Sequence, residues 1–145
     1  MKKLLLLVGL VIAAFIGVTR EDDLSVDDAV GIDTQIEDTP ANAWENRSSN
    51  VQVEGEGIVT RILADDNDGS RHQRFIIRLD TGQTLLVSHN VDLAPRIPRL
   101  REGDEVAFNG EYEWNPQGGV IHWTHDDPEG RHPAGWIKHD GATYQ

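Results

Sequence analysis

The sequence contains no cysteine, and this absence removes several kinds of chemistry. No disulfide framework can staple the fold, no thiolate can hold zinc, and no cysteine can serve as a nucleophile. Any metal ion must therefore be bound by histidine, carboxylate or carbonyl groups. Basic residues are also scarce, with 13 Lys and Arg against 25 Asp and Glu and a formal net charge of -12. Because polyanions are bound by basic surfaces, we do not expect non-specific binding to nucleic acid or to anionic lipid.

A long hydrophobic run is present only at the N-terminus. Lys2 and Lys3 precede an uncharged apolar run at 4–18, which has the form of a signal peptide. Such a run rises about 22 Å as a helix, less than the ~30 Å of a bilayer core. We therefore predict that residues 1–19 form an apolar leader helix that exports the protein to the periplasm or the extracellular space. No clear Ala-x-Ala cleavage site follows, so the alternative is an uncleaved leader that anchors the chain in the inner membrane as its one membrane contact.

Residues 20–50 are predicted to form an acidic linker. Residues 21–50 contain nine acids against one base, Arg47, so they cannot bury enough apolar surface to repay the entropy of ordering. A short helix near 40–48 is the exception, because Thr39 suits a helix N-cap and Pro40 suits the first turn. We expect Trp44 on this helix to pack against the domain that follows.

Residues 51–145 are predicted to form a single all-β domain. Apolar residues alternate with polar ones, as in half-buried strands, and turns rich in Gly and Asp separate the segments. A long connection with two prolines, at 90–100, follows the third segment. This arrangement favours a small five-stranded OB-like barrel, since an eight-stranded lipocalin barrel would need more chain. The predicted strands are 51–62, 74–79, 84–89, 106–114 and 120–124, and the His-rich tail after them is predicted to be irregular.

Several long motifs in this domain resemble those of a known family. They are Asp65–Phe75, Ser88–Arg96, Gly110–Asn115 and the segment from His122 to Trp136. With these motifs, the sequence resembles a family of small exported bacterial proteins that carries a domain of unknown function, over essentially all of residues 51–145. The resemblance implies a similar fold and an exported location. It implies no activity and no catalytic residue, because none is assigned to the family.

The C-terminal tail concentrates side chains that bind metals. Neutral imidazole and carboxylate groups are good ligands of zinc and other divalent transition ions. We therefore consider a divalent metal as a cofactor, with four candidate ligands: His122, His125, Asp126 and His132. Successive side chains of a strand point to opposite faces, so His122 and His125 would face apart in a continuous strand. They could share an ion only if the strand ends near Thr124. The alternative is that these histidines hydrogen-bond to the backbone of the tail.

The acidic run at 65–69 resembles, at first sight, the calcium loop of an EF-hand. Its residues do not match the ligand spacing of that loop, which leaves either a loose calcium site or a plain hairpin loop.

A second set of polar and aromatic residues could form a ligand site. Arginine accounts for eight of the nine basic residues after position 50, and its guanidinium group suits carboxylate and phosphate. The same groups could instead pair with acids of the domain itself. A tryptophan could stack on a sugar or a base. The candidate binding residues are Arg71, His72, Arg74, His89, Asn90, Trp123 and Arg131.

These features favour an exported OB-like binding or accessory module whose partner is a small anionic ligand, a glycan or an envelope protein. A metal-dependent hydrolase of the phosphodiesterase or nuclease type is the alternative, with the four tail residues as ligands and Arg71 or Arg74 stabilising charge. A structural envelope protein is the third interpretation. No complete catalytic motif is present, so the sequence leaves open whether the protein is an enzyme. The binding hypothesis requires that the arginines and histidines converge on one concave face.

Overall fold

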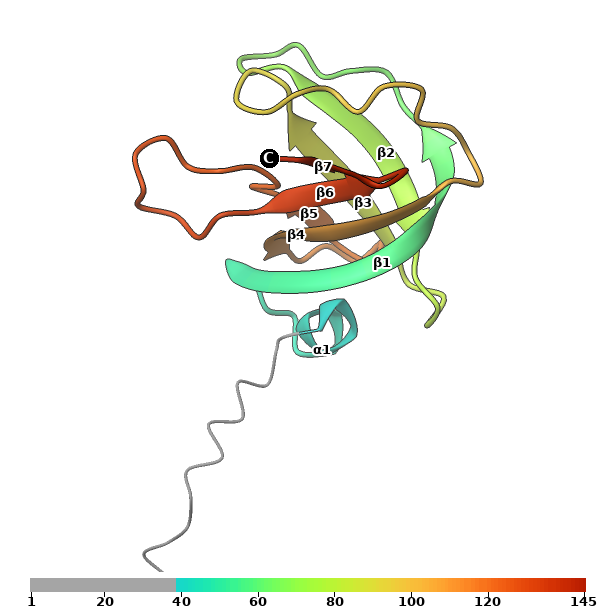
Figure 1. The fold of residues 1–145 in the computed structure, drawn as a ribbon. Helices are drawn as coiled ribbons and strands as arrows, with labels where there is room; N and C mark the ends of the chain where they lie inside the picture. Colours follow the sequence, from blue (N-terminus) through green and yellow to red (C-terminus); the bar gives the residue numbers. More distant parts are fainter. Residues whose placement is uncertain (1–38) are drawn as a thin grey trace, which may run out of the picture. The chain divides into compact units, whose positions relative to one another are not determined.

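The computed structural model describes residues 39–145, and the predicted leader and most of the acidic linker lie outside these residues. The described chain begins with a short helix, α1 (Pro40–Glu45), and its other regular elements are strands (Figure 1). No helix among the described residues is long and apolar enough to cross a membrane. The strands are β1 (Val51–Ile62), β2 (His72–Arg78), β3 (Thr84–Asn90), β4 (Glu105–Glu113), β5 (Val120–His122), β6 (Trp136–His139) and β7 (Ala142–Tyr144).

Five of these strands close into a barrel. The order around it is β1-β2-β3-β5-β4, and β4 pairs back with β1 to complete the circle. Strand β5 folds back from β4 into the gap beside β3, so it runs parallel to β3 while the other neighbours are antiparallel. The predicted all-β, five-stranded OB-like barrel is therefore confirmed.

The tail adds a hairpin to the sheet. Strand β6 pairs with the first half of β4, from Val106 to Asn109, while β5 pairs with its second half, from Glu111 to Glu113. Strand β7 then pairs with β6. Both tail strands are too short for a recognisable alternation, and the prolines before them indicate a loop. The tail, which we expected to be irregular throughout, is thus irregular mainly between β5 and β6.

Strand alternation fills the barrel with apolar side chains. Leu85 and Val87 in β3 and Phe108 and Tyr112 in β4 are fully buried, whereas their neighbours face outward. Burying one such side chain stabilises the fold by about 1.5–3 kcal/mol. The Tyr112 hydroxyl donates to the Gly118 carbonyl oxygen over 2.9 Å, so the ring is buried without an orphaned polar atom. The core also includes Val53, Val59, Phe75, Ile77, Ile97, Val106, Ile121 and Ile137.

Helix α1 packs against the barrel beside β1 (Figure 1). Thr39 Oγ1 accepts a hydrogen bond from the Asn42 N–H at 3.2 Å, and Pro40 occupies the first turn, where its missing N–H would have had no helical partner. Pro40 and Ala43 are buried, and they supply the contact with the core. Trp44 also contacts the barrel, because its indole N–H donates to the Asn115 carbonyl oxygen, while 41% of its area stays exposed.

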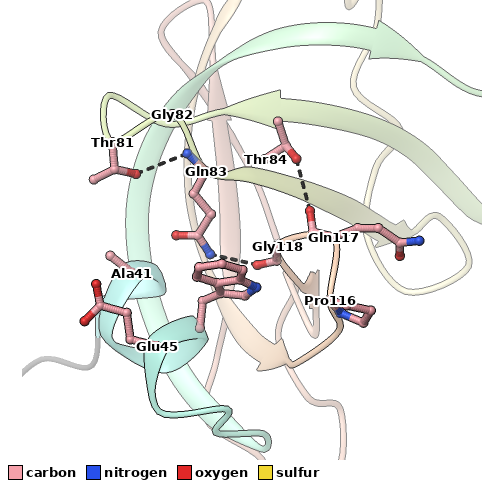
Figure 2. A pocket seen from close by; sticks show the side chains of 10 residues that line it. Ala41, Glu45, Thr81, Gly82, Gln83, Thr84, Pro116, Gln117 and Gly118 are labelled. Atoms are coloured by element: carbon pink, nitrogen blue, oxygen red, sulfur yellow. Dashed lines mark hydrogen bonds between the residues drawn. The ribbon is translucent and has the colours of Figure 1, made fainter.

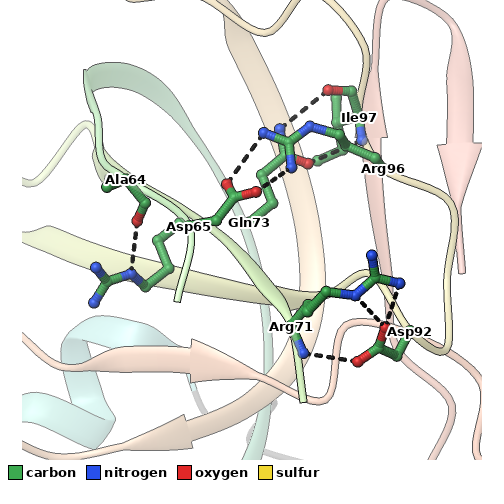
Figure 3. A network of polar contacts seen from close by, with 8 residues as sticks. Ala64, Asp65, Arg71, Gln73, Asp92, Arg96 and Ile97 are labelled. Carbon is green, nitrogen blue, oxygen red and sulfur yellow. Dashed lines mark hydrogen bonds and ion pairs between the residues drawn. The ribbon is translucent and has the colours of Figure 1, made fainter. Parts of the chain in front are cut away.

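Two arginine–aspartate pairs tie the β1–β2 loop to the connection between β3 and β4 (Figure 3). The Arg96 guanidinium donates to both carboxylate oxygens of Asp65, at 2.6 and 3.1 Å. Arg71 donates to Asp92 through its backbone N–H and through Nε, each at 2.7 Å. Paired donors of this kind match the two oxygens of a carboxylate. These arginines therefore neutralise acids of the domain itself.

We predict that Gly119→Ala destabilises the protein. Gly119 has a φ of 111°, and a Cβ there would overlap the Tyr112 ring. Overpacking together with backbone strain should lower the free energy of unfolding by about 2–4 kcal/mol, measured by urea denaturation. Gly69→Ala is the matched control, because Gly69 has a φ of 74° but open space around it, and it should cost about 1 kcal/mol. Equal losses in the two variants would contradict the packing of Tyr112 described above.

The two ion pairs predict how stability depends on pH. The Arg96 guanidinium lowers the pKa of Asp65, and the hydrogen bonds from Arg71 lower the pKa of Asp92. Because these pKa values lie below those of the unfolded chain, the stabilisation is present above about pH 4 and is lost as the pH falls through the lowered values. The Asp65→Asn, Asp92→Asn double variant should therefore have a lower free energy of unfolding than the wild type at neutral pH. In acid, the two free energies of unfolding should become similar.

Urea denaturation across this pH range tests the prediction. Asp80→Asn is the control, because Asp80 is exposed and forms no ion pair within the described residues. A stability gap between wild type and double variant that is as wide in acid as at neutral pH would refute the assignment.

Candidate metal centre

Strand alternation places two glutamates on the outer face of β4. Tyr112 points into the barrel, so its neighbours Glu111 and Glu113 point outward. Strand β5 pairs with this half of β4, with His122 opposite Glu111. Since Ile121 is buried, His122 also faces outward. The β4–β5 hairpin therefore brings two carboxylates and one imidazole to the same face of the sheet.

The ligand atoms of these three residues lie within 4.8 Å of one another. His122 Nε2 is 3.2 Å from Glu111 Oε1 and 3.8 Å from Glu113 Oε1. Despite these distances, Nε2 is buried and forms no hydrogen bond within residues 39–145. A buried polar atom of this kind costs stability unless a ligand or a water molecule satisfies it. We call Glu111, Glu113 and His122 the Glu–Glu–His cluster.

Burial decides the protonation state of His122. Loss of water around the ring lowers the pKa of His122, and this effect outweighs the opposing charges of Glu111 and Glu113. The imidazole is therefore neutral at neutral pH and keeps a lone pair on one ring nitrogen. Neutral imidazole is the form that binds metals.

The loop between β5 and β6 brings a second histidine to the cluster. Segment 127–130 is a tight turn, in which the Gly130 N–H donates to the Asp127 carbonyl oxygen at 3.0 Å. The Asp127 carboxylate accepts hydrogen bonds from the backbone N–H groups of residues 129, 131 and 132 at 2.8 to 2.9 Å. The loop so formed directs His132 back to β4, where its Nε2 lies 2.6 Å from Glu111 Oε2.

His132 donates hydrogen bonds from both ring nitrogens. Its Nδ1 lies 2.8 Å from the Pro133 carbonyl oxygen and its Nε2 faces the Glu111 carboxylate, and neither group can donate in return. Burial by itself would lower the pKa of His132, but the hydrogen bond to Glu111 and the charges of nearby acids raise it instead. In this arrangement His132 has no free lone pair. It therefore orients Glu111 rather than joining the ligand set.

Trp123 covers this histidine. The Trp123 and His132 rings stack with centroids 4.1 Å apart and planes at 10°, and the His125 ring lies 5.2 Å from the Trp123 centroid. Trp123 has a φ of 53°, a left-handed conformation that is strained for a bulky side chain. The stacking of Trp123 on His132 holds the β5–β6 loop against the sheet and offsets the strain in the Trp123 backbone.

Two of the four predicted metal ligands, His122 and His132, lie at this site, whereas His125 and Asp126 do not. Strand β5 ends at His122, yet the chain then buries His125, and its Nδ1 donates to the Asp126 carbonyl oxygen at 2.6 Å. The Asp126 side chain is exposed. The structure therefore groups His122 with the glutamates of β4 rather than with the neighbouring tail residues.

His89, a predicted binding residue, lies inside the barrel. Its side chain is 0% exposed, with Nε2 3.0 Å from the Pro95 carbonyl oxygen and Nδ1 2.8 Å from Thr124 Oγ1. Because a carbonyl only accepts, Nε2 carries the proton and Nδ1 accepts from the Thr124 hydroxyl. Burial lowers the pKa of His89, which keeps the ring neutral. Both nitrogens are thus engaged in holding the fold, and none is available to a ligand.

The predicted arginines do not converge on one face. Arg71 pairs with an aspartate of the β3–β4 connection, and Arg131 pairs with Glu129 of its own loop. Arg74 donates through Nε to the Ala64 carbonyl oxygen at 3.1 Å. The anion-binding arrangement that the binding hypothesis required is therefore not formed by these side chains.

The remaining predicted residues, His72 and Asn90, lie opposite each other on β2 and β3. His72 Nδ1 is 2.8 Å from the Ser70 carbonyl oxygen, and Asn90 Oδ1 accepts from the Asp92 N–H at 2.9 Å. The His72 side chain thus stabilises the turn before β2, and the Asn90 side chain stabilises the turn after β3. Trp123, another binding residue predicted from the sequence, stacks on His132, the histidine that orients Glu111.

Glu111 and Glu113 were not among the predicted ligands, although the sequence carries a signal for them. Two acids flank an inward-facing tyrosine on one strand, and His122 follows a tight turn at 115–119. Counting across an antiparallel hairpin from that turn places Glu111 opposite His122. This signal lies in the pairing register of the β4–β5 hairpin, and counting histidines in the tail does not reveal it.

Comparison with known proteins gives a family and no activity. No curated protein matches the sequence significantly. Residues 25–145 match the family described as "Protein of unknown function (DUF3465)", which agrees with the resemblance found from the motifs. Because the match spans well over half of the chain, the protein belongs to this DUF3465 family.

Proposed function

We propose that the domain is a metal-binding module that holds one divalent transition ion, such as Zn²⁺, in the Glu–Glu–His cluster. The observation that carries the proposal is the buried His122 Nε2, which faces two carboxylate oxygens and has no hydrogen-bond partner among the described residues. Ligand atoms about 2.1 Å from a tetrahedral ion lie about 3.4 Å from one another. The separations of 3.2 and 3.8 Å from His122 Nε2 to the glutamate oxygens lie on either side of this value.

The charge and chemistry of the ligands also support a transition ion. Two carboxylates attract a cation, and one imidazole adds a nitrogen ligand. This mixed set suits Zn²⁺, Mn²⁺ or Fe²⁺ better than Ca²⁺, which takes oxygen ligands. An anionic ligand has less support, because Arg71 and Arg96 already bind aspartates of the domain.

Three protein ligands leave one position of a tetrahedral ion open. Structural zinc sites fill all four positions with protein ligands, whereas an open position is typical of catalytic sites, where a metal activates water. This feature favours a metal-dependent hydrolase as the second candidate function. His132, by fixing the second oxygen of Glu111, would keep the ligands oriented in either case.

The metal site predicts one Zn²⁺ ion per chain, measured by isothermal titration calorimetry on the metal-free full-length protein. His122→Ala removes a direct ligand and should lower the affinity more than about 100-fold. His132→Ala removes only the hydrogen bond that orients Glu111, so it should lower the affinity about 10- to 100-fold and leave the stoichiometry unchanged. The thermal unfolding midpoint should rise with Zn²⁺ in the wild type and stay constant in His122→Ala.

His139→Ala is the matched control. His139 also bonds to a carboxylate, with Nε2 2.9 Å from Asp104 Oδ2, but within residues 39–145 no second acid joins that pair. This variant should bind Zn²⁺ as the wild type does. Equal affinity of wild type and His122→Ala, or no binding by either, would overturn the proposal. Hydrolysis of bis(p-nitrophenyl) phosphate by the Zn²⁺ or Mn²⁺ form tests the second candidate function, the metal-dependent hydrolase. A protein that binds the metal but does not hydrolyse this substrate would contradict a phosphodiesterase function and leave the metal-binding proposal intact.

We also propose that the module works outside the cytoplasm, on the strength of the leader predicted at residues 1–19. Alkaline phosphatase gains activity only after export, because its disulfides form in an oxidising compartment. When fused after Gln145, it should be active in cells, and deletion of residues 2–19 should abolish that activity. Full activity without the leader would refute the export proposal and leave the metal proposal untouched.

A further inference from the structure

A separate concave surface lies beside α1. It is a cavity of about 390 Å³, lined by α1, by the turn between β2 and β3 and by the turn between β4 and β5 (Figure 2). Figure 2 shows the Gln83 side chain extending from the β2–β3 turn into the space between α1 and Gly118. Sites for small molecules have volumes of about 300–1,000 Å³, so the cavity can hold one small ligand.

The lining of this cavity is polar but carries almost no charge. Among the described residues around it, Glu45 is the one with an ionisable side chain, and Lys, Arg and His are absent. An anionic ligand would find no opposite charge there. The Gln117 side chain offers an amide donor and an acceptor, whereas the Gln83 amide and the Thr84 hydroxyl already donate to backbone carbonyl oxygens and offer acceptors. The composition therefore fits a neutral ligand with several polar groups.

Trp44 supplies an aromatic wall whose position is fixed. Its indole N–H donates to the Asn115 carbonyl oxygen at 3.2 Å, and its own carbonyl oxygen accepts from Trp114 Nε1 at 3.1 Å. Even so, 41% of its surface is exposed. A ring held in place before binding loses little entropy when a ligand stacks on it.

Gln83 leaves a hydrogen-bond acceptor without a donor. Its Nε2 donates to the Pro40 carbonyl oxygen at 3.1 Å and to the Gly118 carbonyl oxygen at 2.7 Å, which fixes the orientation of the amide. Its Oε1 is buried and has no hydrogen-bond partner in the described part of the chain. Gln83 lines the cavity, so a ligand hydroxyl or N–H group that reaches this acceptor would satisfy it.

We infer that this cavity is a subsite for one pyranose unit of a neutral saccharide. A pyranose has an apolar C–H face that can stack on the Trp44 indole and hydroxyl groups that can donate to Gln83 Oε1. A ligand needs an apolar face to stack on Trp44 and a hydroxyl group to donate to Gln83 Oε1, and a pyranose has both. The inference goes beyond the proposed metal function, because the saccharide subsite and the Glu–Glu–His cluster share no residue.

Nuclear magnetic resonance of the ¹⁵N-labelled full chain tests this inference through the indole N–H signals. The probes are methyl β-D-glucopyranoside, N,N′-diacetylchitobiose and maltotriose, each at up to about 10 mM, above a weak millimolar dissociation constant. At least one should shift the Trp44 signal in a saturable way and leave the Trp123 and Trp136 signals in place. Glucuronate, an anionic relative of these probes, should bind at least about 10-fold more weakly.

Variants supply the second arm of the experiment. Trp44→Ala should abolish saturable binding of the active probe, and Trp44→Tyr, which keeps an aromatic face, should retain part of it. Trp136→Ala is the matched control, because Trp136 is another partly exposed tryptophan but contacts Lys138, away from the cavity lining, and this variant should bind as the wild type does. The absence of any Trp44 shift with all three neutral probes, or binding that survives in Trp44→Ala, would overturn the inference.

Discussion

Pairing of strand β4 along both of its edges is the constraint on which the rest of this structure depends. Its hydrogen bonds to β1 close the barrel, and its opposite edge is shared by β5 and β6. Because side chains alternate along a strand, the same strand supplies Tyr112 to the core and two glutamates to the outer face. The proposed metal ligands are therefore held at their spacing by the barrel's own hydrogen bonds. Loss of the contact with β1 would open the barrel and disturb the ligands in one event.

The fold could be predicted from the sequence wherever a local pattern was long enough to define a buried face. The segments 51–62 and 84–89 repeat apolar residues on one parity, and the structure has strands over nearly the same residues. The β6–β7 hairpin has no such pattern, because its order comes from pairing with β4, which is distant in sequence. Short strands that depend on a non-local partner leave little trace in the residues themselves.

The candidate site could be predicted only in part, because histidines with the same chemistry have different roles here. Strand parity determines that His122 faces outward, but His132 arrives through a loop whose course depends on the Asp127 carboxylate. His89 and His125 are buried, with ring nitrogens engaged by nearby groups of the fold. The composition of the tail indicated that histidines could bind a metal. Burial and hydrogen-bond partners, which only the structure gives, distinguish a ligand histidine from a structural one.

The turn between β4 and β5 limits how this domain can vary in evolution. Asn115 Oδ1 accepts hydrogen bonds from the N–H groups of Gln117 and Gly119, which sets the length of the turn. One inserted residue would shift β5 by one position, so that Ile121 would turn to solvent and His122 to the core. The same insertion would displace a wall of the cavity beside α1. Two surface sites with unrelated chemistry thus share one length requirement.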